Sequence, residues 1–592
     1  MHYSVRPKQT LAMETRDRVR LEADVYYPDS AADFPVLLMR QPYGRSIAST
    51  VVYAHPTWYA AQGYIVVIQD VRGRGSSAGE FDLFAHEIAD GADTVNWAAN
   101  LPQSTGAVGM YGFSYQGMTQ LFAAIQNPSA LKTICPSMIG YDLYQDWAYE
   151  GGAFCYQNNL GWALQLASET ARRRQDEETY RTLYAAAHNL PIADPVCPTS
   201  GILSHLAPDS HYHAWLTQPE SDPYWQQRSP SSQFQTVDLP MLHVGGWFDA
   251  HLRGTIRFYQ AMAARSTYPQ HLWIGPWAHL PWSRKTGAID YGAEANSPID
   301  RLQVRWFDHF LKGIDSGLLD QPPVCLFEMG TNQWCRFDHF PPAGSHFYQL
   351  VTTGLAGMDE REGKLIAESS TELNSELSDE LSAKLATELK FELFIESITE
   401  SITESITELV PHNTHQLTDI LVHDPWRPVP SQGGHAGFPA GSFDRSSIDG
   451  RSDVLTYTTE PFTTDLHLAG SITVELSCQA DAPSFDLCAV LSEVKPNGQV
   501  FNFSQGYRRV AAATPAVAYQ TLTLQPTCIC IPRGSALRLS ISGACFPSYA
   551  VNAGTGTAPH ASHLIAAQVI TLQIYSDANL PSRVYLPILD RT

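Results

Sequence analysis

The chain has 592 residues and a mass of 65.4 kDa, more than one hydrophobic core can organise, so we expect several domains. Hydrophobic residues make up 44% of the chain and charged residues 17%, which excludes a largely disordered protein. Thirty-eight basic against 60 acidic residues give a net charge of −22, and so negative a surface repels phosphate backbones and anionic lipids. Nucleic acids and membranes are therefore not expected partners.

The cysteines and the N-terminal residues indicate the compartment. No apolar stretch follows the basic residues near the N-terminus, and no run approaches eighteen consecutive apolar residues. The ten cysteines are scattered except for Cys528 and Cys530, whose spacing places them on one face of an expected strand, and no zinc or redox spacing is present. We predict an unexported, cytoplasmic protein with buried free thiols, no cofactor and no metal.

Apolar runs and helical patterns alternate through the first part of the chain. Strands are expected at 20–27, 35–41, 64–71 and 108–112, and a helix at 86–100. The run YIVVI at the start of 64–71 is apolar without alternation, which is typical of a parallel strand covered on both faces. The pattern predicts the first part of an α/β core over residues 1–130.

Three further segments follow. Residues 131–237 are dominated by helix and loop patterns rich in Trp, Tyr, Gln and Asn, which predicts an inserted helical cap. The α/β pattern resumes over 238–316 and completes the core. Residues 317–592 contain short strands separated by turn residues without intervening helices, which is typical of an antiparallel β-sandwich or jelly roll.

An acidic repeat interrupts the predicted sandwich. Residues 359–408 hold fourteen acidic and four basic residues, and glutamate recurs every four residues up to the closing ESITESITESITE. Because a period of four drifts against 3.6 residues per turn, glutamates and aliphatic residues would form adjacent slanted stripes on a helix. The repeat is typical either of a solvated, frayed helix or of a helix that binds a partner, and we assign it no chemistry.

One serine lies between glycines at a predicted strand-to-helix corner. Ser114 in GMYGFSYQGMTQ follows the strand at 108–112 and precedes a helical pattern. A nucleophile elbow needs such small neighbours, because bulky side chains would block the sharp turn that exposes the hydroxyl. Ser114 is therefore the candidate nucleophile, although a tight turn that only packs a helix on the sheet would show the same glycines.

A nucleophilic serine needs a base and a carboxylate that orients this base, expected in the chain order Ser, acid, His. Asp249 and His279 each follow a predicted strand, where α/β sheets place their sites. His243 and His251 flank the acid, but the first falls within a strand and the second at the start of a helix. They are weaker candidates for the base.

Six sequence segments, taken together, resemble a known family of hydrolases. In one order over nearly the whole chain, RQPYGR, QDVRGRGSSAGEFD, GMYGFSYQGMTQ, GGWFDAHLRGT, IGPWAH and HDPWRPVPSQGG resemble the cocaine esterase and X-prolyl dipeptidyl-peptidase hydrolases (CocE/NonD type). The resemblance implies an α/β-hydrolase core with a helical cap and a C-terminal jelly roll, and a catalytic triad of Ser114, Asp249 and His279.

The resemblance also implies how the oxyanion is held, namely by the hydroxyl of Tyr43 and the backbone N–H of Tyr115. From the residues alone, a tyrosine after a proline at a strand end is also typical of a packed corner. Asp70 and Arg72 lie in a segment that is structural in the family, and we expect them to form a supporting ion pair.

The sequence predicts a serine hydrolase that acts on a small ester or amide and forms an acyl-enzyme. Relatives that cleave α-amino acid esters carry carboxylates after the triad aspartate, whereas here Ala250, His251 and Leu252 follow it. One alternative is a dipeptidyl-peptidase that releases X-Pro, with Glu150 or Asp146 of the cap binding the free amine. Another is a carbohydrate-binding protein with an inert hydrolase domain. A homo-oligomer is possible because sandwich domains often mediate association.

Overall fold

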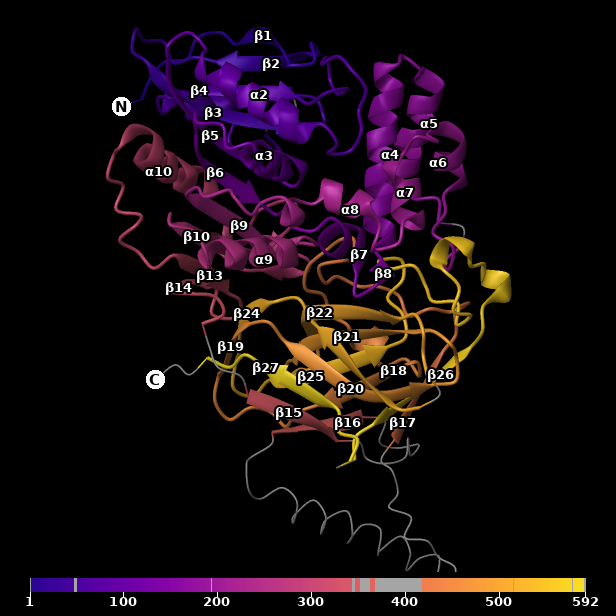
Figure 1. Ribbon diagram of the computed structural model, residues 1–592. Coiled ribbons are helices and arrows are strands. Elements are labelled where there is room, and N and C mark those ends of the chain that lie inside the picture. The colour runs from indigo at the N-terminus through magenta and orange to yellow at the C-terminus, as the bar shows by residue number, and fades with distance from the viewer. Residues whose placement is uncertain are drawn as a thin grey trace, which may run out of the picture.

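The computed structural model describes residues 2–46, 50–192, 194–342, 346–351, 362–367, 418–514, 516–577 and 579–589. Apart from Glu362–Ala367 (β16), the acidic repeat lies outside these residues. Figure 1 shows the α/β core at the top, the helical cap beside it and the β-sandwich below both. Within the described ranges, no helix combines the length and the apolar composition that crossing a bilayer requires.

The core is organised by one sheet of ten strands. In spatial order these are β1 (Gln9–Glu14), β2 (Arg20–Tyr26), β4 (Ile65–Asp70), β3 (Phe34–Gln41), β5 (Ser104–Phe113), β6 (Leu131–Ser137), β9 (Met241–Phe248), β10 (Gln270–Ala278), β13 (Val324–Glu328) and β14 (Gln333–Phe337). Pairing is parallel from β4 through β13 and antiparallel at both edges. The carboxyl ends of the parallel strands therefore meet at one rim, where a site is expected.

Two predicted domain boundaries fall inside this sheet and are corrected by it. Leu131–Ser137 (β6) pairs with β5 and β9 and is not part of the cap, and Val324–Phe337 forms β13 and β14 and not the first sandwich strands. Each of these strands completes a parallel crossover, β5–α3–β6 or β10–α10–β13, so each predicted boundary lies between a helix and the strand that it leads to.

Helices cover both faces of the sheet. They are α1 (Pro56–Ala61), α2 (Glu87–Ala99), α3 (Tyr115–Ile125), α9 (Leu252–Ala263) and α10 (Ile299–Lys312). Successive side chains of β3 point to opposite faces of the sheet and enter two different hydrophobic clusters. Val36 and Leu38 pack with α2 and α3, whereas Leu37 and Met39 pack with α1 and α10. Burial on both faces explains why the central strands are apolar without alternation.

The cap lies between β6 and β9. It contains a π-helix (Tyr144–Ala148), β7 (Tyr149–Glu150), β8 (Ala153–Phe154), α4 (Tyr156–Arg173), α5 (Glu177–His188), α6 (Gly201–Leu206), α7 (His211–Thr217) and α8 (Pro223–Arg228). Its aromatic side chains, including Phe154, Tyr212, Trp215 and Trp225, are buried in the same hydrophobic cluster as α2 and α3. Most of the cap's aromatic content therefore fixes the cap to the core.

The C-terminal part is a β-sandwich. Its large sheet contains β17 (Thr418–His423), β26 (Ile570–Tyr575), β20 (Thr473–Ala480), β27 (Arg583–Leu586), β15 (His346–Val351), β16, β18 (Val454–Thr458), β25 (Ala536–Ser542), β21 (Phe485–Val494) and β22 (Val500–Val510), with β23 (Ala518–Thr523) beside β20. A short helix, α12 (Ser446–Asp449), precedes β18. A separate ribbon pairs β19 (Leu466–Gly470) with β24 (Thr527–Ile531), and a bridge between Met329 and Ile529 joins this ribbon to the end of β13.

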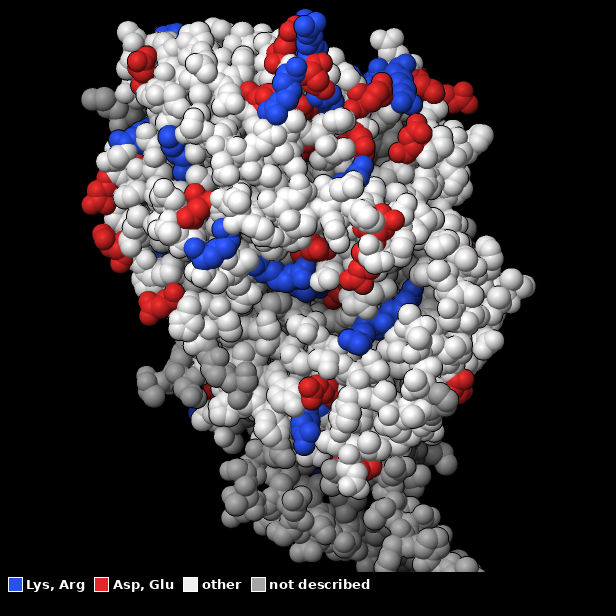
Figure 2. Space-filling view, viewed as in Figure 1, with Lys and Arg blue, Asp and Glu red and all other residues white. Residues whose placement is uncertain are grey.

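Charge is unevenly spread over the molecule. On the face shown in Figure 2, charged side chains gather over the α/β core and the cap, and few lie over the sandwich. The acidic repeat, which carries nearly half of the net charge, belongs by sequence to the sandwich part of the chain. Nearly half of the excess negative charge thus falls within one segment of fifty residues.

Candidate active site

Ser114 occupies a strained turn between β5 and α3. Its φ of 58° and ψ of −127° lie in a region that non-glycine residues rarely adopt and that costs about 1–3 kcal/mol. The turn is held by hydrogen bonds on both sides, because the Ser114 N–H donates to the carbonyl of Ser137 and the Ser114 carbonyl accepts from Met118. A strained turn between a strand and a helix is the conformation that a nucleophile elbow needs.

The two glycines near Ser114 are required by close packing. A Cβ at Gly112, whose φ is +145°, would lie 2.5 Å from Cβ of Gln116. A Cβ at Gly117 would lie 2.3 Å from Cγ2 of Ile139 and 2.9 Å from the carbonyl oxygen of Ser137. Larger residues would push α3 away from β5 and β6, so the glycines make the tight turn possible.

The structure brings Asp249 and His279 together. Asp249 follows β9, His279 follows β10, and Nδ1 of His279 lies 2.7 Å from Oδ1 of Asp249. The carboxylate is buried, whereas the imidazole is partly exposed. An Nδ1–H donated to Asp249 leaves the lone pair on Nε2, so this arrangement fixes the tautomer of the imidazole.

The neighbours of His279 tie it to the serine turn. Phe113, the residue before Ser114, has its ring centroid 5.4 Å from that of His279. Trp282 donates its indole N–H to the carbonyl of His279 over 3.0 Å. From the sandwich, the amide of Gln525 donates to the backbone carbonyl of Asp249 over 2.7 Å. The sandwich therefore supports the loop that carries the carboxylate.

The structure also brings Tyr43 to Ser114. The Ser114 side chain is close enough to the Tyr43 hydroxyl to oppose the rise of the Tyr43 pKa, and the indole N–H of Trp162 in the cap donates to this hydroxyl over 3.0 Å. Burial raises the pKa of Tyr43 to about 12, with the hydrogen bond from Trp162 opposing the rise. At neutral pH the phenol keeps its proton and can donate it in a hydrogen bond.

The second oxyanion candidate is the backbone of Tyr115. This residue begins α3, and the first N–H groups of a helix have no acceptor within the helix. Its side chain is buried and donates from its hydroxyl to Oε1 of Glu87 over 2.9 Å. The side chain thus anchors the start of the helix, whereas the N–H remains available to a ligand beside Ser114.

The two alternative histidines, His243 and His251, are buried and neutral. His243 is buried within β9 and bonds the side chain of Gln270 through Nε2. His251 precedes α9, with its ring 5.1 Å from that of His279 and 4.2 Å from that of Trp147. Burial lowers the pKa of His243 and of His251 to about 4, so both stay neutral at pH 7.

The expected ion pair between Asp70 and Arg72 is wrong. Asp70 lies at the end of β4 and pairs with Arg45 at 2.5 Å, whereas Arg72 pairs with Asp17 and Asp90. The loop that follows β4 turns over the Asp70 carboxylate and directs Arg72 away from it, toward α2. Sequence proximity predicted a partner that the turn geometry does not allow.

A buried guanidinium lies close to the candidate oxyanion residues. Arg74 donates to the carbonyl of Leu166, covers the ring of Phe81 and interacts electrostatically with Tyr43 and Tyr115. Burial lowers the pKa of Arg74 to about 10, so the group remains charged at pH 7. Its positive potential favours negative charge beside Ser114. Sequence reasoning missed this role, and the GRG segment gave no specific signal for it.

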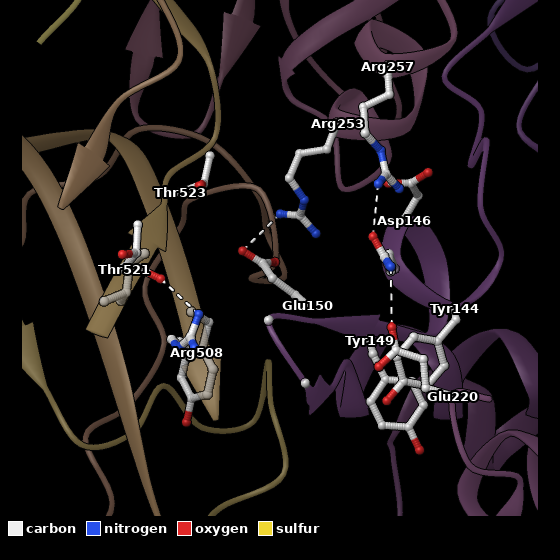
Figure 3. Close-up of a pocket in the computed structure, with 15 residues that line it drawn as sticks. Tyr144, Asp146, Tyr149, Glu150, Glu220, Arg253, Arg257, Arg508, Thr521 and Thr523 are labelled. Atoms are coloured by element: carbon white, nitrogen blue, oxygen red, sulfur yellow. Dashed lines mark hydrogen bonds and ion pairs between the residues drawn. The ribbon is translucent and has the colours of Figure 1, made fainter. Parts of the chain in front are cut away.

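A cleft of about 400 Å³ lies where the cap, α9 and the sandwich meet. Figure 3 shows its two cap carboxylates facing arginines of α9: Glu150 pairs with Arg253 at 2.8 Å, and Asp146 pairs with Arg257. The backbone carbonyl of Asp146 also accepts a hydrogen bond from Nδ1 of His251. His251 therefore contacts both Asp146, which lines the cleft, and the ring of His279.

Glu150 is the centre of a buried network. It bonds Nε2 of His435 at 2.8 Å and the hydroxyl of Tyr549, both from the sandwich, in addition to Arg253. Burial by itself would raise the pKa of Glu150, but Arg253, His435 and Tyr549 outweigh it and lower the pKa to about 2. The ionised carboxylate thus joins the cap, the core and the sandwich.

We expect Glu150→Gln to lower the free energy of unfolding at pH 7 by about 3–5 kcal/mol, because it leaves the buried charge of Arg253 unpaired. The folded-state pKa of Glu150 lies below the unfolded value of about 4.3, so this stabilisation is complete above pH 4.3 and is lost as the pH falls toward 2. Denaturant unfolding of both proteins at pH 7 measures the lost stability, and the difference between them should shrink as the pH is lowered from 4 toward 2.

Glu220→Gln is the matched control for this measurement. Glu220 lines the same cleft but is exposed and accepts from the side chain of Gln145. Its replacement should change the free energy of unfolding by less than about 0.5 kcal/mol. Equal effects of the two variants would contradict the assigned role of Glu150.

Two family models match the chain. Residues 17–281 match the X-Pro dipeptidyl-peptidase (S15 family), and residues 316–584 match the X-Pro dipeptidyl-peptidase C-terminal non-catalytic domain. Cocaine esterase of Rhodococcus sp. (strain MB1 Bresler) is 28% identical over 632 aligned positions, which cover 100% of this chain and 99% of that protein. The chain is a serine hydrolase built from an S15-family domain and an X-Pro dipeptidyl-peptidase C-terminal domain. It is therefore an enzyme, and an inert binding protein is set aside.

Solved structures agree on the fold of this hydrolase. An aminopeptidase from a marine sediment archaeon (Thaumarchaeota archaeon) superposes with a TM-score of 0.77 at 20% identity, covering 99% of this chain and 97% of that one. An α-amino acid ester hydrolase superposes with a TM-score of 0.74 at 21% identity and the same coverage. The predicted α/β-hydrolase core with a C-terminal β-sandwich is confirmed.

Proposed function

We propose that this hydrolase cleaves a small ester or amide by transferring its acyl group to Ser114, with His279 as base and Asp249 as orienting carboxylate. The observation that carries the proposal is the 2.7 Å contact between His279 and Asp249 at the rim where Ser114 occupies a strained elbow. A serine, an oriented imidazole and a buried carboxylate are the groups that acyl transfer requires.

The proposed reaction has two steps. Nε2 of His279 takes the proton of the Ser114 hydroxyl while Oγ attacks the carbonyl carbon of the substrate, and the proton then passes to the departing alcohol or amine. In the second step His279 deprotonates a water molecule, which attacks the acyl-enzyme and releases the acid. Ser114 recovers its proton from His279, so the enzyme returns to its starting state.

The negative oxygen that forms in each step would lie between Tyr43 and the N–H of Tyr115. The nearness of the Tyr43 hydroxyl to the Ser114 side chain supports this assignment, because a phenol beside Oγ can donate to an oxygen on the attacked carbon. Trp162 holds the phenol in place by donating to its oxygen. The buried charge of Arg74 adds a favourable potential.

We expect Tyr43→Phe to lower kcat about 100- to 1,000-fold with little change in KM, since the lost hydroxyl acts on the transition state more than on the bound substrate. Steady-state kinetics on a p-nitrophenyl ester measures both constants. Tyr141→Phe is the control, because this partly buried tyrosine packs on Phe258 away from the site. A kcat within threefold of wild type would remove Tyr43 from the oxyanion assignment.

The pairing of two cap carboxylates favours a substrate without a free amine. The two cap carboxylates that the sequence offered for an ammonium group, Glu150 and Asp146, are both paired with arginines. If either carboxylate bound a substrate ammonium group instead, its arginine would lose its partner and leave a buried or half-buried guanidinium unpaired. A dipeptidyl-peptidase would need a carboxylate available to the substrate, so the ester or amide is the first candidate.

A direct comparison of substrates tests this preference. We expect kcat/KM for a p-nitrophenyl acyl ester to exceed that for Gly-Pro p-nitroanilide by at least 100-fold, measured at equal pH and enzyme concentration. An N-acetylated Gly-Pro anilide serves as the matched control, because it differs only in the blocked amine. Faster cleavage of the free dipeptidyl anilide than of both other substrates would instead establish the X-Pro dipeptidyl-peptidase activity.

A further inference from the structure

In the part of the chain that the structure describes, one group of side chains has the composition of a metal site, and it lies away from Ser114. Asp465, His467 and Cys530 each offer one ligand atom, and these atoms all lie within 4.8 Å of one another. Cys530 is buried, His467 is partly buried and Asp465 is exposed, so the group reaches from the interior to solvent. An ion could therefore reach the group from the solvent side, where Asp465 is exposed.

The backbone brings these three side chains together. His467 on β19 and Cys530 on β24 are directly paired across the antiparallel ribbon, which brings their side chains to the same side. Asp465 comes directly before β19, two residues before His467, and its carboxylate lies within 4.8 Å of the other two ligand atoms. Its Oδ1 accepts from the backbone N–H of Arg533 over 2.9 Å, which fixes the orientation of the carboxylate.

The distances suit a tetrahedral ion. Nε2 of His467 lies 3.9 Å from Sγ of Cys530. Zinc bonds of about 2.0–2.1 Å to nitrogen and about 2.3 Å to sulfur place the two atoms about 3.6 Å apart at the tetrahedral angle. A shift of a few tenths of an ångström would therefore let one ion contact both atoms.

A carboxylate behind His467 is a second, independent observation. Nδ1 of His467 lies 2.9 Å from Oε1 of the fully buried Glu328, at the end of β13 in the catalytic sheet. Metal-binding histidines regularly donate their second ring N–H to a carboxylate, which directs the lone pair of the other nitrogen toward the ion. Here that nitrogen is Nε2, the atom that faces Cys530.

We propose that Asp465, His467 and Cys530 bind one zinc ion, with Glu328 orienting the histidine and water completing the coordination. Thiolate, imidazole and carboxylate together favour zinc over magnesium or calcium, which prefer oxygen ligands alone. Because Glu328 belongs to the core and the ligands belong to the sandwich, the ion would connect the two domains beside the bridge of Met329 and Ile529. This site is independent of the triad.

Zinc titration of the full-length protein tests the proposal. Metal-free protein, kept reduced, is titrated with zinc against a chromophoric chelator, and one zinc per chain is expected. Cys530→Ser and His467→Ala should each weaken this binding at least 100-fold, and Glu328→Gln should weaken it about 10- to 100-fold. Binding of zinc should also raise the thermal midpoint of the wild-type protein but not that of Cys530→Ser.

Cobalt gives a direct signature of the sulfur ligand. We expect cobalt-loaded wild-type protein to show a thiolate charge-transfer band that Cys530→Ser lacks. Asp465→Asn is the variant to use if the buried substitutions fail to fold, because this side chain is exposed, and it should lower zinc affinity at least tenfold. Cys335→Ser and His563→Ala, which lie outside the group, should bind zinc as the wild type does.

Two results would overturn the site. One is a wild-type protein that binds no more zinc than Cys530→Ser or Asp465→Asn. The other is a cobalt band that persists in Cys530→Ser, since the sulfur ligand would then be another cysteine. Ester hydrolysis by these variants should equal that of the wild type, which serves as the check that they are folded.

Discussion

Replacing Ser114 with alanine is expected to lower kcat for a p-nitrophenyl ester on the order of 10,000- to 1,000,000-fold, the range for loss of a triad nucleophile. The loss is large because no acyl-enzyme can form, and the oxyanion donors then act only on direct attack by water. KM should change little, since the side chain is small. The alanine should relieve none of the backbone strain, because the positive φ is imposed by the hydrogen bonds of the turn.

A second measurement separates loss of the nucleophile from loss of the fold. A fluorophosphonate probe should label the wild-type protein at Ser114 and leave Ser114→Ala unlabelled. Ser168→Ala is the matched control: it removes another nearly buried serine, whose hydroxyl donates only to the carbonyl of Gln165 in its own helix. Turnover by Ser114→Ala within tenfold of wild type, with a wild-type thermal midpoint, would exclude Ser114 as the nucleophile.

The positions of the proposed triad were accessible from the sequence for a physical reason. Parallel strands buried on both faces are apolar without alternation, so β5, β9 and β10 could be recognised, and the residue that follows each one falls at a common rim. The two glycines near Ser114 added the signature of the turn. Local patterns were sufficient because each residue is positioned by the strand directly before it.

Contacts between distant segments were not accessible in the same way. Gln525 supports the Asp249 loop from the sandwich, and His435 and Tyr549 complete the network of Glu150. Nothing in the flanking sequence of these residues distinguishes them from other polar residues near strand ends. Their partners are set by the docking of whole domains.

The proposed zinc ligands illustrate the same limit. His467 and Cys530 are 63 residues apart, and Glu328, which orients the histidine, lies 139 residues before it, so these residues form no motif with metal-binding spacing. The sequence therefore predicted no metal, and only the pairing of β19 with β24 and their contact with β13 reveals the group. Ligands that lie on separate strands have no fixed spacing in the sequence, so rules based on spacing do not find such a site.

Asp249→Asn is expected to lower kcat about 10,000-fold while leaving the fold intact. Asp249 is fully buried, and its Oδ1 accepts from Nδ1 of His279, so the charged carboxylate both selects the tautomer and stabilises the imidazolium that forms during attack. The isosteric amide keeps the volume but can present its NH₂ group to Nδ1. His279 would then carry its proton on Nε2, where it cannot act as a base toward Ser114.

Kinetics of Asp249→Asn, together with fluorophosphonate labelling, distinguishes this explanation from a structural one. The backbone carbonyl of Asp249, which accepts from Gln525, is untouched by the substitution, so the thermal midpoint should stay near that of the wild type. Labelling should slow in parallel with kcat, because both need the same proton transfer. Gln525→Leu, the control, removes the support of the loop but leaves the carboxylate, and we expect a loss below about tenfold. A larger loss in Gln525→Leu than in Asp249→Asn would mean that the position of the loop, and not the charge on Asp249, limits the rate.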